Sequence, residues 1–174
     1  MSLQLSGTSG VLDNSGAFIA GTAVASTSGT SIDFTSIPSW VKRVTVMFSG
    51  VSTNGSSFPL IQIGSGSPAT TGYVATGTHL TSGAGSTAFT TGFGIDQVGD
   101  AGVIFQGLMT ICLLNSSTNL WVASGVVGAV APSYTQTAPF AGTKALSGVL
   151  DRVRITTVNG TDTFDSGSIN ILYE

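Results

Sequence analysis

The amino-acid sequence predicts an all-β protein, and three observations support this fold class. Short runs rich in β-branched residues recur along the chain, bounded by Gly, Pro, Asn and Ser, as is typical of sandwiches and barrels. Gly, Ser and Thr occur 24 times each in 174 residues, and helix signals are nearly absent. A hydrophobic share of 41% with a net charge of −3 is unlike a disordered chain, which combines low hydrophobicity with high net charge. Turn signals about ten residues apart predict about eight to ten strands in an antiparallel β-sandwich of the jelly-roll type.

The clearest predicted strand covers residues 41–49. Val44, Val46 and Phe48 share one face of this strand, because successive side chains of a strand point to opposite sides, and we expect that face to be core. Residues 58–64 follow a turn-rich segment and are expected to form a hairpin with the first strand. Pro59 places this second segment at a strand start or a sheet edge, because proline cannot donate to a ladder.

A continuous apolar run over residues 103–114 predicts a central strand that is buried on both faces. It is followed by a loop at 115–119 and a further strand at 120–124. Between Gly64 and Gly102 the sequence is rich in Gly, Ser and Thr, and we expect long loops there with one or two weak strands.

The C-terminal part predicts two strands, over residues 151–158 and 168–173. Between them, Asn159-Gly160 is a dipeptide that tolerates positive φ angles in a tight hairpin turn. At the other end of the chain, residues 1–20 have little bulk and are interpreted as an arm or attachment segment. The sequence therefore predicts one β-sandwich domain over residues 21–174.

The low content of charged residues bears on the partners of the protein. Only 7% of residues are charged, including five basic residues, so a phosphate-neutralising surface for nucleic acid is not expected. A solvated monomer normally keeps a charged surface. We therefore predict a homo-oligomer in which uncharged surface is buried between subunits. The sequence predicts no membrane insertion and no secretory signal. We expect the protein to be assembled in a cytoplasm.

Residues that carry enzymatic chemistry are scarce. His79 is the only histidine and Cys112 the only cysteine, too few for a zinc site within one monomer, although a threefold axis could bring three His79 side chains together around an ion. No nucleophile elbow accompanies the histidine. The carboxylate pairs Asp96 with Asp100 and Asp162 with Asp165 were weighed for glycoside hydrolysis and for calcium binding. Both pairs have the pattern of turns in which Asp bonds its own backbone. The sequence thus predicts no enzyme, no metal and no cofactor.

Two segments resemble modules at the ends of phage and prophage tail fibres and related virion proteins. The first runs from Thr27 to Gly55 and contains Ile37-Pro-Ser-Trp-Val-Lys-Arg-Val-Thr-Val-Met-Phe48, and the second runs from Lys144 to Glu174 and contains Leu150-Asp-Arg-Val-Arg-Ile-Thr-Thr-Val-Asn-Gly160. The likeness covers about residues 21 to 174. It implies a trimeric β-sandwich displayed on a virion, with its tip touching a glycan or protein of the host surface.

These observations lead to the hypothesis of a phage virion protein, a homotrimeric short tail-fibre subunit. The alternative is a capsid decoration protein that stabilises the head. In the fibre hypothesis, the arm attaches to the tail or baseplate, and loops within 65–92 and 131–142 contact the host receptor. The candidate attachment residues are Leu3, Leu5, Val11 and Leu12, and the candidate receptor contacts are Tyr73, His79, Tyr134 and Phe140.

Overall fold

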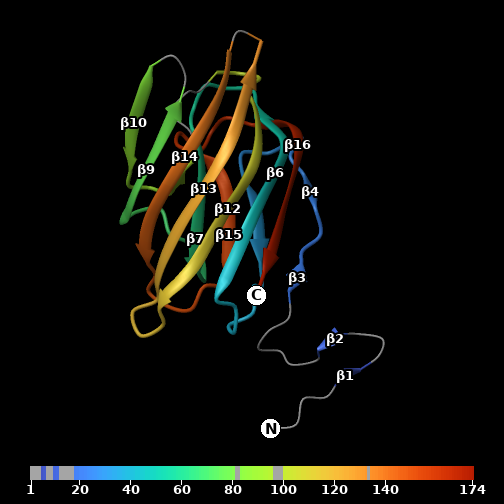
Figure 1. The fold of residues 1–174 in the computed structure, drawn as a ribbon, viewed down its shortest axis with the longest axis vertical. Helices are drawn as coiled ribbons and strands as arrows, with labels where there is room; N and C mark the ends of the chain where they lie inside the picture. Colours follow the sequence, from blue (N-terminus) through green and yellow to red (C-terminus); the bar gives the residue numbers. More distant parts are fainter. Residues whose placement is uncertain (1–4, 7–9, 12–17, 81–82, 96–99, 133) are drawn as a thin grey trace.

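The described part of the chain folds into two antiparallel sheets that pack face to face (Figure 1). The computed structural model describes residues 5–6, 10–11, 18–80, 83–95, 100–132 and 134–174. All regular elements within these residues are β-strands. The predicted all-β antiparallel sandwich is therefore confirmed, although sixteen strands are found where about eight to ten were expected.

The larger sheet has nine strands and carries the long strands of the fold. Its order along the hydrogen-bonded path begins at one edge with β10 and ends at the other with β3. The strands in that order are β10 (Ala84–Phe89), β9 (Tyr73–Leu80), β14 (Tyr134–Ala145), β13 (Leu120–Ala131), β12 (Ile104–Asn115), β6 (Arg43–Thr53), β16 (Phe164–Tyr173) and β3 (Ile19–Ala20), with β4 (Val24–Ala25) also paired to β16.

The smaller sheet has five strands and covers one face of the larger sheet (Figure 1). Its strands in order are β11 (Phe93–Gly94), β7 (Pro59–Ser65), β15 (Arg152–Thr157) and β5 (Ile32–Thr35), with β8 (Ser67–Pro68) paired to β7. Two further strands, β1 (Leu5–Ser6) and β2 (Gly10–Val11), form a separate two-stranded sheet. Ile19–Ala20, which the sequence analysis assigned to the arm, pairs with β16 in the larger sheet.

The core lies between the two sheets and is built from alternate positions of the strands. Val44, Val46 and Phe48 of β6 are buried as expected from their shared face. They belong to one cluster with Ile61 of β7 and Ile155 of β15, which come from the opposite sheet. Pro59 is the first residue of β7, in agreement with its inability to donate to a ladder.

Two predicted hairpins are wrong. β6 and β7 lie in different sheets, so the segment between them crosses from one layer to the other. The same holds for β15 and β16, where Gly160 does adopt a positive φ of 67° but the chain continues to the other sheet. The loop expected at 115–119 joins β12 to β13, and these two strands pair with each other in an antiparallel hairpin. The Asn115 side chain holds the turn by accepting hydrogen bonds from the amides of Ser117 and Thr118.

One predicted burial pattern and two predicted loop regions also need correction. The run at 103–114 forms the central strand β12, but only one of its faces is core: Met109 and Ile111 are fully buried while Leu108 and Leu114 are exposed. The region from 64 to 102 is more regular than expected, because it contains the antiparallel pair β9 and β10. Residues 134–142, expected as a loop, belong to β14.

Candidate functional site

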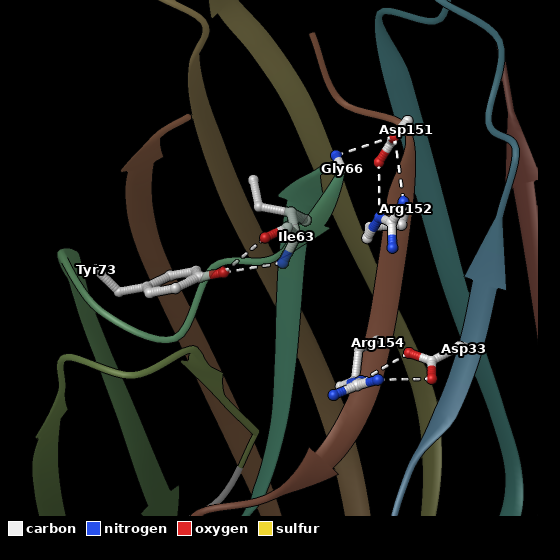
Figure 2. A network of polar contacts seen from close by, with 7 residues as sticks. All are labelled: Asp33, Ile63, Gly66, Tyr73, Asp151, Arg152 and Arg154. Carbon is white, nitrogen blue, oxygen red and sulfur yellow. Dashed lines mark hydrogen bonds and ion pairs between the residues drawn. The ribbon is translucent and has the colours of Figure 1, made fainter. Parts of the chain in front are cut away.

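Two of the four predicted receptor contacts are core residues. Tyr73 is 2% exposed and Phe140 is 4% exposed. The Tyr73 hydroxyl accepts a hydrogen bond from the Ile63 amide at 2.8 Å and donates one to the Ile63 carbonyl at 3.2 Å (Figure 2). Its ring packs edge-on against Phe93, with 4.9 Å between ring centroids. A receptor cannot reach these rings in this conformation, which corrects the expectation for both residues.

The other two predicted contacts lie on the same two neighbouring strands. His79 sits in β9 opposite Gly85 and is partly buried, and its Nδ1 atom has no hydrogen-bond partner in the described residues. Tyr134 begins β14 and packs partly buried against the core. The structure thus brings the four residues onto adjacent strands but does not gather them into one exposed surface.

The predicted attachment residues fall mostly outside what the structure describes. Leu3 and Leu12 lie outside the described residues, whereas Leu5 and Val11 are register partners in the β1–β2 pair. Their role in attachment stays a prediction.

Four carboxylates are candidates for catalysis or calcium binding, and two of them accept hydrogen bonds from neighbouring residues of the fold. Asp96 lies outside the described residues, and Asp100 is exposed. Asp162 accepts hydrogen bonds from the Ser57 amide at 2.8 Å and from Asn159 Nδ2 at 2.6 Å, and Asp165 accepts one from the Ser52 hydroxyl. Within the described residues no group of three or more His, Cys, Asp or Glu is placed to hold a metal ion. The described carboxylates of the second pair therefore have structural partners.

A row of paired charges lies on β15 and its neighbours in the smaller sheet (Figure 2). Arg154 donates two parallel hydrogen bonds to Asp33 of β5, Nε to Oδ1 at 2.7 Å and Nη2 to Oδ2 at 2.8 Å. Arg152 Nε donates to Asp151 at 2.8 Å, and Asp151 also accepts from the Gly66 amide at 3.0 Å. The hydrogen bond from Arg152 lowers the pKa of Asp151, and the hydrogen bond to Asp33 raises the pKa of Arg154.

The Arg154 pair is expected to contribute little to stability. Each of its side chains is 35% exposed, and ion pairs with this access to water typically contribute about 0–1 kcal/mol. We expect Arg154→Met to lower the free energy of unfolding by less than about 1 kcal/mol. Urea unfolding at low and at high salt checks this; a loss of several kcal/mol would contradict a surface role for the pair.

A polar groove adjoins this charged row. Its volume is about 310 Å³, at the lower end of the range of about 300–1,000 Å³ for ligand sites. Gln62 of β7 and Arg154 of β15, which are register partners, lie along it with Leu60 and Thr156. Thr157 at the end of β15 also lines the groove. The remaining lining residues come from the connections around the sheet, and they are Thr30, Ser31, Thr70, Thr91, Val158, Asn159 and Gly160.

The larger sheet presents a second feature, which we call the uncharged face: the outward-facing side of β9, β10, β12, β13 and β14. These strands contain one charged residue, Lys144, whose ammonium lies over the Tyr73 ring at 5.3 Å from its centroid. Large apolar side chains are exposed on three of the strands, up to 75% for Val74. They are Val74, Leu80, Ile104, Leu108, Leu114, Val126 and Val130.

Neither the polar groove nor the uncharged face could be located from the sequence. Composition indicated an uncharged surface, and the alternation of Arg152, Arg154 and Thr156 indicated one face of a strand. The partner Asp33 is 121 residues away from Arg154 in the chain, and no local pattern connects them. The hydroxyl residues that line the groove are equally common elsewhere in the sequence.

Comparisons with protein-family models, with curated proteins and with solved structures gave no match. The described residues include no helix of the length and apolar character needed to cross a membrane. The polar groove and the uncharged face are therefore the candidate functional surfaces of the described residues.

Proposed function

We propose that the protein is a structural subunit of a phage virion, a short tail fibre that works as a homotrimer whose copies meet through the uncharged face. The observation that carries this proposal is the uncharged face itself, whose five described strands contain one charged residue, Lys144 over the Tyr73 ring, and expose seven large apolar side chains. Four of these side chains are cross-strand neighbours, Leu108 with Val126 and Ile104 with Val130, and large exposed apolar patches mark interaction sites.

The size of the uncharged face suits a stable interface. Five strands about 4.8 Å apart, each with about ten residues at about 3.3 Å, span roughly 800 Å². A standard interface buries about 800 Å² on each partner. Because the face carries no charge for an ionic partner to recognise, a second copy of the same face or a similarly apolar surface is its natural complement.

The position of the other elements supports a fibre role. β1 and β2 pair with each other and, within the described residues, with no strand of the sandwich, so this segment is available to the tail or baseplate. The smaller sheet packs on the face of the larger sheet that lies opposite the uncharged face (Figure 1), and residues of the smaller sheet line the polar groove. Copies joined through the uncharged face leave that side open to a host surface.

The interface is tested by placing charge at its centre. Leu108 and Val126 are exposed register partners on β12 and β13. We expect the double variant Leu108→Glu and Val126→Glu to weaken association at least about 100-fold, because desolvated like charges across an interface cost several kcal/mol. Sedimentation equilibrium gives the mass of each form, and circular dichroism shows whether the β fold is retained.

The control is Val149→Glu, which adds one glutamate at an exposed valine outside these strands. It is expected to keep the trimeric mass of the wild-type protein. A monomeric wild-type protein at micromolar concentration, or a trimer that the double variant leaves intact, would rule out the proposed interface. A stable dimer would contradict the trimer.

The place on the particle is a separate question that labelling answers. Antibodies against the protein are expected to bind the tail in electron micrographs of intact virions. Labelling spread over the head would contradict the fibre assignment and favour capsid decoration.

A further inference from the structure

We propose that the polar groove on the smaller sheet binds a short uncharged oligosaccharide. This inference concerns a different side of the molecule from the uncharged face, and it deepens the receptor-contact part of the proposed function by naming a site and a ligand class. It rests on the arrangement of donors and acceptors along the groove and on its charge.

The floor of the groove presents a donor beside an acceptor. Arg154 is held by Asp33 through Nε and Nη2, and its Nη1 makes no hydrogen bond within the described residues. Gln62 is 6% exposed and donates through Nε2 to the Thr91 carbonyl at 2.8 Å. Its Oε1 accepts no hydrogen bond from the described residues. A sugar hydroxyl both donates and accepts, so it can satisfy either group.

Hydroxyl groups extend the same pattern along the groove. Thr156 donates to the Thr30 carbonyl at 2.9 Å, which leaves its oxygen as an acceptor. Thr70 and Thr30 are exposed and belong to the connections that flank the sheet. Val158 is 47% exposed and adds aliphatic surface against which the C–H face of a sugar ring can pack. The groove therefore combines a few positioned polar groups with apolar contact, as binding sites for small ligands do.

The charge of the groove selects against ionic ligands. Among the described residues that line it, Arg154 is the only charged one, and the bidentate pair with Asp33 neutralises it. A carboxylate, phosphate or sulfate ligand would have to compete with Asp33 for the guanidinium. An ammonium ligand would find no carboxylate among the lining residues. An uncharged polyhydroxylated ligand meets neither cost.

A glycan array that contains neutral, sialylated, sulfated and amino-sugar glycans tests the proposal with labelled full-length protein. We expect binding to neutral glycans and no preference for the charged classes. Gln62→Leu removes the floor carboxamide and is expected to weaken the binding about tenfold, the effect of losing one or two hydrogen bonds. A thermal melt of each variant checks that the fold is retained.

Two adjacent exposed threonines provide a matched pair that does not disturb the floor. Thr70 lines the groove and Thr71 does not. Thr70→Arg fills the groove and is expected to abolish binding, whereas Thr71→Arg adds the same side chain outside it and is expected to bind as the wild type does. Binding to no neutral glycan, a preference for charged glycans, or equal binding by the two arginine variants would overturn the proposal. Because the oligomeric mass is measured independently, failure here is distinguishable from failure of the trimer interface.

Discussion

Replacing Gly167 by alanine is expected to lower the free energy of unfolding by about 3–5 kcal/mol, from two added costs. Gly167 has a φ of +88°, where an L residue costs about 1–2 kcal/mol. A methyl group there would also lie 2.4 Å from the Gly50 carbonyl carbon and oxygen and 2.6 Å from the Ser49 oxygen. These are backbone atoms of the neighbouring strand β6, so they move only if the β6–β16 pairing is disturbed.

Gly160→Ala provides the matched control for this prediction. Gly160 has a similar φ of +67°, but no atom lies within 4 Å of the position that its Cβ would occupy. This variant is expected to lose only the conformational term of about 1–2 kcal/mol. Urea unfolding followed by circular dichroism measures both values. If the two variants lose the same stability, the close approach of the strands at Gly167 contributes nothing and the prediction is wrong.

The individual strands were predictable because the pattern that defines them is local. The alternation in residues 41–49 identifies the buried face of β6, and Val44, Val46 and Phe48 are buried as that pattern requires. The Asn-rich turn at 115–119 likewise joins neighbouring strands of one sheet. Both predictions depend on the residues of one or two adjacent strands, which is the range over which side-chain periodicity is informative.

The assignment of strands to sheets was not predictable in the same way. The Asn159-Gly160 dipeptide permits a hairpin, but residues after it form their own contacts: Asp162 binds the Ser57 amide and the Asn159 side chain. The bond to Ser57 joins segments 105 residues apart, and the strand that follows, β16, lies in the opposite sheet from β15. A local turn signal cannot distinguish this crossing from a hairpin.

For the candidate sites, too, the sequence predicts local properties but not which strands lie together in space. Composition predicted that uncharged surface exists, and the structure locates it on β9, β10 and β12–β14. The Gly-, Ser- and Thr-rich composition of residues 64–102 predicts long loops with one or two weak strands. Gly77 is nevertheless an inward position of β9, where an added Cβ would lie 3.0 Å from the Phe89 ring and 3.1 Å from the Gly94 carbonyl oxygen. Small residues here reflect close packing, which sequence alone does not separate from flexibility.

The stability of the protein is expected to fall as the pH rises above about 10, because Tyr73 cannot ionise where it is buried. Desolvation by burial raises the pKa of Tyr73 despite the opposing hydrogen bond with the Ile63 backbone. An unfolded tyrosine has a pKa of about 10. Above this pH the unfolded chain loses a proton that the folded protein keeps. The free energy of unfolding therefore decreases by up to about 1.4 kcal/mol per pH unit, until the pH passes the folded pKa.

Tyr73→Phe separates this effect from the titration of other groups. Near neutral pH the variant is expected to be about 1–3 kcal/mol less stable, because it leaves the buried Ile63 amide without its hydroxyl partner. Above pH of about 10 the gap between the two proteins is expected to narrow, since only the wild type carries the phenol. Urea unfolding of both proteins at a series of pH values measures the gap. A difference that stays constant across the series would show that the phenol ionises as readily in the folded protein as in the unfolded chain, and Tyr73 would then not be the buried anchor between β9 and β7 that its contacts indicate.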